Sequence, residues 1–152
     1  MGCGKTTLGR EIAQKHDMDF VDMDEQIQEQ EGKSIGEIFA EYGEDHFRNL
    51  ESKLLSSFSK NSNLVISTGG GAPCFNHNME VINSLGTSVY IKLDADTLSG
   101  RLRAEKESRP LISSLSEEEL LDFIEIKLAE RAFFYEQAHQ VFTTIPHVFS
   151  DS

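Results

Sequence analysis

The first residues of the chain, Gly2-Cys3-Gly4-Lys5-Thr6-Thr7, have the types and spacing that hold phosphate groups. They match the second half of the loop G-x-x-x-x-G-K-[ST]. In that loop backbone N–H groups surround the phosphates, the lysine reaches the terminal ones and the hydroxyl ligates Mg²⁺. The spacing of Leu8, Ile12 and Ala13 predicts a helix directly after the loop, and its N-terminal dipole would assist Lys5. The alternative is a bare turn, but the helix that follows favours a phosphate site with Mg²⁺.

Two aspartates, Asp22 and Asp24, end a short strand that is predicted over residues 19–22. Side chains two residues apart in an extended chain point to the same side, and two carboxylates there repel unless a cation or a proton lies between them. Mg²⁺ is one reason for such a pair, and an alcohol substrate that needs a base is another. The structural alternative is a solvated turn before a helix, with Asp24 as its N-cap.

Arg48 and Glu51 lie three residues apart on one face of a helix predicted from its apolar positions between Phe47 and Phe58. The structural interpretation is a surface ion pair worth about 0.2–0.5 kcal/mol. An arginine oriented by a glutamate can instead bind a carboxylate through two hydrogen bonds. Arg131 lies on a predicted long helix, four residues before Tyr135, and leaves the same two interpretations open.

Three glycines, residues 69–71, directly follow a buried-type strand predicted over 64–68. Glycines weaken regular elements, so close approach of the backbone to a ligand explains them better than a structural role. Arg109 lies in a polar segment, about residues 104–116, between two predicted helices. Long segments without structure are often lids, and a lid arginine can stabilise a transferring phosphoryl group when the site closes.

Strands and helices alternate along the chain, which predicts a three-layer α/β/α fold with a central parallel sheet. The strands are expected over 19–22, 64–68, 88–93 and 140–143, and capping boxes at Ser34 and Ser116 mark two helix starts. Ligands of such sheets bind beyond the carboxyl ends of the strands. We therefore expect Lys5, the two aspartates, the three glycines and the segment after Arg103 at one end of the molecule.

The composition of the chain suits a single globular domain, with 152 residues and a net charge of −12. This charge argues against nucleic acid as a partner, because such binding needs clustered Lys and Arg. The sequence has neither an apolar run that could span a membrane nor a secretion signal, so we expect a cytoplasmic enzyme. Two cysteines and five scattered histidines give no zinc or redox motif.

Together these elements resemble the shikimate kinase family, in the nucleoside-monophosphate-kinase-like branch of P-loop proteins. The resemblance runs from Gly2 to about Phe142 on the motifs G-K-T-T, F-V-D-M-D, F-R-x-x-E, S-T-G-G-G-A, S-R-P-L and R-A-F-F-Y-E-Q-A. It implies a P-loop kinase domain over 1–152 and transfer of phosphate from ATP to the 3-hydroxyl of shikimate, in the route to chorismate and the aromatic amino acids. It also implies ATP and Mg²⁺ as cofactors, and a monomer.

The resemblance further implies which residues act. Catalysis falls to Lys5, Asp24 and Arg109, with Asp24 at the reacting hydroxyl. Shikimate lies against the helices of about 34–59 and contacts Asp24, Arg48, Gly70, Gly71 and Arg131, the two arginines holding its carboxylate. The nucleotide contacts Gly2, Cys3, Gly4, Lys5, Thr6, Thr7, Arg103 and Arg109, where Arg103 would stack on adenine. Mg²⁺ is held by Thr6 and, through water, by Asp22.

The chain departs from the family pattern at both ends. The family begins with a strand and a complete loop, but that strand and the first glycine are absent from these 152 residues. The missing strand lies at the centre of this fold, so its neighbours would keep unpaired backbone groups and an apolar gap. We therefore expect roughly ten upstream residues in the native product, or another chain in the gap. After Thr143 no helical pattern follows, although Pro146 would suit an adenine-contacting loop.

Two other functions remain open from the sequence. A related small-molecule kinase, for a nucleotide or gluconate, would share the phosphate loop. F-R-x-x-E beside G-G-G-A argues against a nucleotide kinase, and the segment R-P-L together with Arg131 argues against a gluconate kinase. A kinase-like binding module without catalysis is the second alternative. Such a module has no physical reason to keep Lys5, Asp24 and Arg109 together.

Overall fold

The computed structural model describes residues 5–60, 62–105 and 112–143, without the side chains of Lys5, Ala104 and Glu105. Its helices and strands follow one another as α1 (Lys5–Lys15), β1 (Asp19–Asp22), α2 (Met23–Glu31), α3 (Ile35–Tyr42), α4 (Glu44–Ser57), β2 (Leu64–Ser67), the 3₁₀ turn η1 (Ala72–Cys74), α5 (Asn78–Leu85), β3 (Val89–Ile91), α6 (Ala95–Glu105), α7 (Glu117–Tyr135) and β4 (Gln140–Phe142). The predicted alternation of strands and helices is confirmed. In the described ranges, no helix combines the length and apolar composition that crossing a membrane requires.

The strands pair in parallel, as the alternating pattern predicts. β1 pairs with β2, with Asp19 opposite Leu64 and Asp22 opposite Ser67. β3 pairs with β4, and the described strands form two separate two-stranded sheets. The register brings the carboxyl ends of β1 and β2 side by side, so Asp22 lies next to the strand that leads into the glycines.

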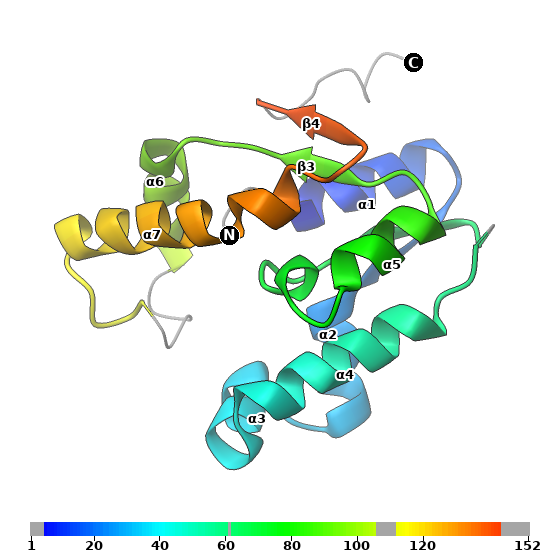
Figure 1. The fold of residues 1–152 in the computed structure, drawn as a ribbon, viewed down its shortest axis with the longest axis horizontal. Helices are drawn as coiled ribbons and strands as arrows, with labels where there is room; N and C mark the ends of the chain where they lie inside the picture. The colour runs from blue at the N-terminus through cyan, green and yellow to red at the C-terminus, as the bar shows by residue number, and fades with distance from the viewer. Residues whose placement is uncertain (1–4, 61, 106–111, 144–152) are drawn as a thin grey trace.

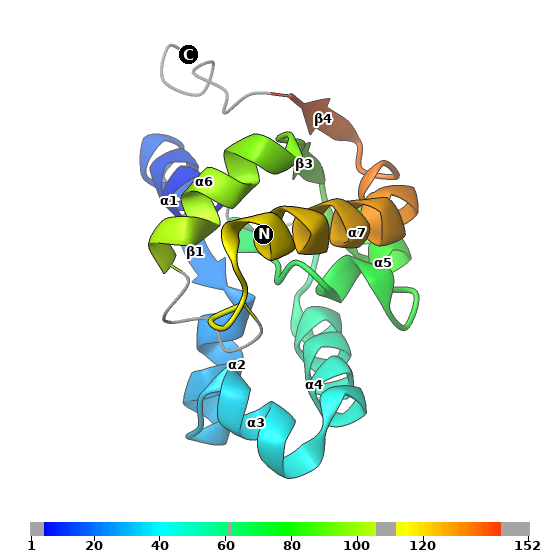
Figure 2. The same ribbon diagram turned by 90° about the vertical axis from the view of Figure 1, so that its left-hand side faces the viewer.

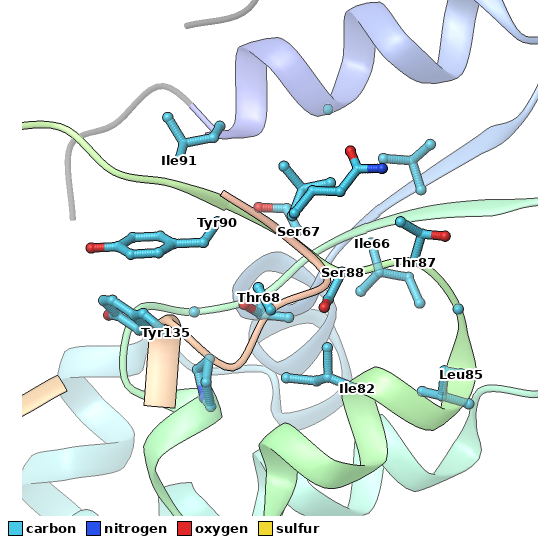
Figure 3. Close-up of a pocket in the computed structure, with 18 of the residues that line it drawn as sticks. Ile66, Ser67, Thr68, Ile82, Leu85, Thr87, Ser88, Tyr90, Ile91 and Tyr135 are labelled. Atoms are coloured by element: carbon cyan, nitrogen blue, oxygen red, sulfur yellow. The ribbon is translucent and has the colours of Figure 1, made fainter. Parts of the chain in front are cut away.

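An apolar cavity of about 690 Å³ lies between β2 of one sheet and β3 of the other. Helix α1 contributes Leu8 and Ile12 to its wall, and α5 contributes Ile82 and Leu85. Figure 3 shows Ile66 of β2 and Tyr90 and Ile91 of β3 around this space. The sequence predicts an apolar gap within the sheet, and the cavity agrees with that expectation. That a further strand fills the gap stays a prediction.

Two apolar clusters hold the helices in place. Helices α2, α3 and α4 lie together at one end of the molecule, away from β3 and β4 (Figures 1 and 2). Their cluster is made of Met23, Ile27, Ile38, Phe47, Leu54 and Leu55. The second cluster joins α6 to α7 through Leu98, Leu102, Ile112, Leu120 and Ile124. Both predicted capping boxes are present, at Ser34 for α3 and at Ser116 for α7.

The segment around the aspartates differs from its predicted structure. Asp22 ends β1 and is itself the N-cap of α2, with its carboxylate accepting from the N–H groups of Asp24 and Glu25 at 3.0 and 3.2 Å. Asp24 therefore lies inside the first helical turn. The prediction that both side chains project from an extended strand is wrong, and so is the alternative of Asp24 as N-cap.

Candidate active site

The site begins where α1 and β1 come together. The hydroxyl Oγ1 of Thr6, in the first turn of α1, donates to Oδ2 of Asp22 at 3.0 Å. The other oxygen of Asp22 is used in capping α2, so this one carboxylate joins the starts of two helices. The predicted metal ligands, Thr6 and Asp22, are thus in direct contact. The first N–H groups of any helix lack partners within that helix, and helix N-termini therefore suit anions. α1 begins at Lys5, next to Thr6.

Asp24 and Glu51 meet against the first glycine of the turn. A Cβ atom placed on Gly69 would lie 2.9 Å from Oδ1 of Asp24 and 3.1 Å from Oε2 of Glu51. Real side-chain carbons do not approach so closely, so only glycine fits here without displacing a carboxylate. The structure thus shows close approach of two protein side chains to this glycine. The close approach to a ligand that the sequence predicts for the turn stays a prediction.

Arg48 packs on the third glycine in the same way. A Cβ on Gly71 would lie 2.6 Å from both terminal nitrogens of Arg48. The guanidinium donates to Glu51 at 2.7 Å and to Glu44 at 3.1 Å, and it lies 4.3 Å from the ring centroid of Phe75. Fixed by two carboxylates and one aromatic face, this side chain is only 11% exposed. Its position is therefore set before any ligand arrives.

Glu51 is buried, with 1% of its surface exposed, although the sequence left open a surface ion pair with Arg48. Burial raises the pKa of Glu51, the hydrogen bond and charge of Arg48 lower it, and the charge of Asp24 raises it further. A charged pair in such a place needs its partners to compensate for lost hydration. The interpretation as a solvated surface pair is wrong.

Arg131, on α7, is connected to the glycine turn of residues 69–71 through Tyr135. Its Nη1 donates to the hydroxyl of Tyr135 at 3.4 Å, and that hydroxyl donates to the carbonyl of Gly70. The charges of Arg131 and Arg48 both lower the pKa of Cys74, against the burial that raises it. Arg131 also lowers the pKa of Glu51. Arg131 is connected to Gly70 through Tyr135 and Arg48 packs on Gly71, so arginines from α4 and α7, far apart in the sequence, meet at one glycine turn.

The oxygen donors at this end of the molecule suit Mg²⁺. Among the described residues no group of three His, Cys, Asp or Glu side chains could hold a metal ion. Mg²⁺ does not need such a cage, since it usually keeps several waters and takes one or two protein oxygens plus substrate phosphates. The hydroxyl of Thr6 and the carboxylate of Asp22 are such a pair.

Some predicted site residues lie elsewhere or outside the description. Gly2, Cys3, Gly4, Arg109 and the side chain of Lys5 lie outside the described part, although the backbone of Lys5 opens α1. Thr7 is exposed on α1. Arg103 forms an ion pair with Glu117 at 3.2 Å, and both side chains are exposed.

Two side chains that contact Arg48 or the glycine turn were not predicted from the sequence as site residues. The aromatic face of Phe75 and the hydroxyl of Tyr135 contact Arg48 and Gly70, respectively. The spacing of Arg131 and Tyr135, one helical turn apart, was a visible signal that the two side chains are neighbours. Nothing local indicates that the partner of Tyr135 is a glycine 65 residues away.

Comparison with known proteins gives one answer. The model of the family described as shikimate kinase matches residues 1–147. A shikimate kinase of Bacteroides fragilis is 46% identical over 142 residues, which are 93% of this chain and 79% of the relative. A shikimate kinase of Azobacteroides pseudotrichonymphae is 47% identical over 143 residues, which are 93% of this chain and 84% of the relative.

Solved structures agree. The crystal structure of shikimate kinase from Bacteroides thetaiotaomicron superposes with a TM-score of 0.91 at 45% identity, over 97% of this chain and 84% of that one. Shikimate kinase from Acinetobacter baumannii, in complex with shikimate, gives a TM-score of 0.85 at 33% identity, over 99% of this chain and 83% of that one. The fold is that of the P-loop α/β kinases, as the sequence predicts. The chain belongs to the shikimate kinase family.

Proposed function

We propose that this chain transfers the terminal phosphoryl group of ATP to the 3-hydroxyl of shikimate. The observation that carries the proposal is the convergence of Arg48, Arg131 and Asp24 on one glycine turn, beside the N-terminus of α1. The relative from Acinetobacter baumannii, in complex with shikimate, supports the same substrate. Shikimate offers one carboxylate and three hydroxyls, which matches two guanidinium groups and an aspartate.

Arg48 and Arg131 bind the substrate carboxylate in this proposal. Arg48 is already oriented by Glu51 and Glu44, so little side-chain freedom is lost when an acid binds. Guanidinium groups suit this task because their parallel N–H groups match the two oxygens of a carboxylate. The backbone of Gly70 and Gly71 closes the same side of the pocket, without side chains that would occupy it.

Asp24 contacts the hydroxyl that is phosphorylated. Its carboxylate lies in the first turn of α2, next to Asp22 and facing Gly69. From there it orients the hydroxyl and accepts its proton as the bond to phosphorus forms, while ADP leaves with the bonding electron pair. Phosphoryl transfer depends mainly on positioning and charge neutralisation, so the direction of this one carboxylate matters more than its basicity.

The nucleotide lies at the N-terminus of α1. Gly2, Cys3, Gly4 and Thr7 donate backbone N–H groups to its phosphates, and Lys5 and Arg109 balance their charge. Thr6 and Asp22 hold Mg²⁺, which neutralises charge on the phosphates when bound. Arg103 lies in its ion pair with Glu117 and is free to turn toward adenine only when that exposed pair opens.

The experiment is an assay of ADP release from ATP and Mg²⁺, with shikimate, gluconate or no acceptor. We expect ADP release to depend on shikimate and to produce shikimate 3-phosphate. Release that depends on gluconate identifies the other small-molecule kinase, and ATP binding without turnover identifies a binding module. Either result contradicts the proposal.

Arg48→Ala should raise the KM for shikimate and leave the KM for ATP unchanged.

A further inference from the structure

Tyr135 connects two parts of the candidate site that the sequence keeps apart. It is the last residue of α7, and its hydroxyl donates to the carbonyl of Gly70 while accepting from Arg131. Figure 3 shows its ring beside that of Tyr90 on β3, and the two ring centroids lie 5.0 Å apart. A hydroxyl that donates and accepts at once fixes the relative positions of both partners.

The carbonyl of Gly70 and the N–H of Gly71 belong to one peptide unit. In a trans peptide these two groups point in opposite directions, so holding the carbonyl on α7 turns the N–H away from α7. Among the described residues none accepts a hydrogen bond from this N–H, whereas the N–H groups of Ala72 and Cys74 bond to Gly69 and Gly71. A peptide between two glycines rotates easily, so an external contact is needed to keep one orientation.

We propose that Tyr135 is a positioning residue for the acid-binding half of the site. It holds the Gly70–Gly71 peptide so that the N–H of Gly71 is offered to the substrate, and it holds the guanidinium of Arg131 beside it. This inference rests on the proposed function, because it names the group that orients two of its binding partners. Tyr135 itself does not touch the reacting atoms.

The surroundings of the phenol suit this role. Burial raises the pKa of Tyr135 above its ordinary value, more than the charge and hydrogen bond of Arg131 lower it. The hydroxyl therefore keeps its proton, and remains a donor to Gly70, over the whole range in which the enzyme would act. The ring contact with Tyr90 holds the end of α7 against β3, so the hydroxyl is fixed through its ring as well.

The test is Tyr135→Phe in the full chain, with steady-state kinetics and denaturant unfolding. Loss of the two hydrogen bonds that hold Arg131 and the carbonyl of Gly70 should raise the KM for shikimate about tenfold, while the KM for ATP changes less than about twofold. Ser84→Ala is the control, because it also removes a hydroxyl that donates to a backbone carbonyl, that of Val81 at 2.7 Å, and Ser84 is exposed on α5, outside the helices of residues 34–59. The control should leave both constants unchanged.

A readout without substrate separates this inference from the proposed function. The order parameters of the backbone amides of Gly70 and Gly71, measured by NMR relaxation without substrate, should fall in Tyr135→Phe and stay unchanged in Ser84→Ala. Unchanged order parameters, or an unchanged KM for shikimate, overturn the inference. An equal rise in both KM values together with a lower free energy of unfolding also overturns it, since this combination indicates a structural role alone. If the wild type lacks shikimate-dependent turnover, the proposed function fails and the order parameters alone decide the role of Tyr135.

Discussion

At the scale of single residues, two neighbouring aspartates have different surroundings. Asp22 is engaged by Thr6 and by the cap of α2, whereas Asp24 faces the glycine turn beside Glu51. We propose that the first serves the metal side of the site and the second the acceptor hydroxyl.

Asp24→Asn should lower kcat by about 10²–10⁴-fold, because the amide cannot accept the proton of the hydroxyl. The KM for ATP should change little, since in our proposal the phosphates bind on the side of Thr6. The measurement is steady-state ADP release, with the exposed Asp122→Asn on α7 as control. Normal turnover in Asp24→Asn removes this residue from its proposed role.

Glu51 makes stability depend on pH in a defined direction. Burial raises its pKa in the folded chain, so the proton is bound more tightly in the folded than in the unfolded state. The stabilisation is complete below the ordinary carboxyl pKa and is lost as pH rises through the raised one. Relative to Glu51→Gln, the wild type should lose free energy of unfolding over this window, by at most about 1.4 kcal/mol per pH unit.

Urea unfolding of both proteins across this pH range checks the expectation. A difference in free energy that grows with pH would mean that the ion pair with Arg48 outweighs the cost of burial. Glu37→Gln controls for the loss of one carboxylate, because Glu37 is exposed on α3. This change weakens the capping box at Ser34 by about 1 kcal/mol at most.

Much of the site could be predicted residue by residue. The three glycines after a strand favoured a site by themselves, whereas Arg48, Glu51 and Asp24 each also suited an ordinary surface pair or turn and gained weight only from the motifs around them. The burial of Glu51 could not be predicted, since it depends on α2 and the glycine turn covering α4 in space. The capping role of Asp22 was missed because α2 carries only two buried residues, Met23 and Ile27, and shows little apolar periodicity.

At the scale of elements, the glycine turn acts as a surface on which functional side chains pack. Gly69 lies against Asp24 and Glu51, Gly70 is held by Tyr135, and Gly71 lies against Arg48. The turn begins two residues after the end of β2 at Ser67, so the paired strand fixes the position from which the turn starts. A side chain on this turn should therefore disturb binding more than folding.

Gly71→Ala should raise the KM for shikimate by about tenfold or more, because its methyl group displaces the guanidinium of Arg48. The free energy of unfolding should fall by about 1–3 kcal/mol at most, as for other crowded substitutions. Gly100→Ala on α6 is the control, since nothing lies within 4 Å of its added carbon. An unchanged KM for shikimate in Gly71→Ala would show that Arg48 does not bind the acid from this position.

Helix boundaries followed their local signals where these were strong. Both capping boxes lie at their predicted serines, and Gly43 ends α3 as expected. β3, Val89–Ile91, is shorter than the strand predicted over 88–93. Asp94 follows it, and its carboxylate accepts from the N–H of Thr97 at 2.7 Å, so α6 begins after a side-chain cap.

At the scale of the whole molecule, the cavity between β2 and β3 affects stability. Ser67 and Ser88 are both buried and both line it (Figure 3). The hydroxyl of Ser67 has no hydrogen-bond partner among the described residues. Ser88 donates to Asn83 and accepts from the backbone N–H of His139.

Ser88→Ala should cost about 1–3 kcal/mol of unfolding free energy, because it leaves the N–H of His139 without an acceptor. Ser67→Ala should be neutral or stabilising by up to about 1 kcal/mol, because it removes a buried hydroxyl that has no partner. Urea denaturation of both variants measures the contrast. A large loss in Ser67→Ala would mean that its hydroxyl bonds to a group inside the cavity.

The overall architecture was predictable because alternating strands and helices allow few arrangements. The convergence of Arg48 and Arg131 was not, because it depends on how α4 and α7 pass on either side of the glycine turn. Only the resemblance to a family, carried by motifs far apart in the sequence, connected these residues before the structure did.

The most direct test of the account is a crystal structure with shikimate and ADP bound. We expect the substrate carboxylate within about 3 Å of guanidinium nitrogens of both Arg48 and Arg131, and a ring hydroxyl at the same distance from the carboxylate of Asp24. Shikimate bound elsewhere, or with its carboxylate turned away from both arginines, would contradict the central claim.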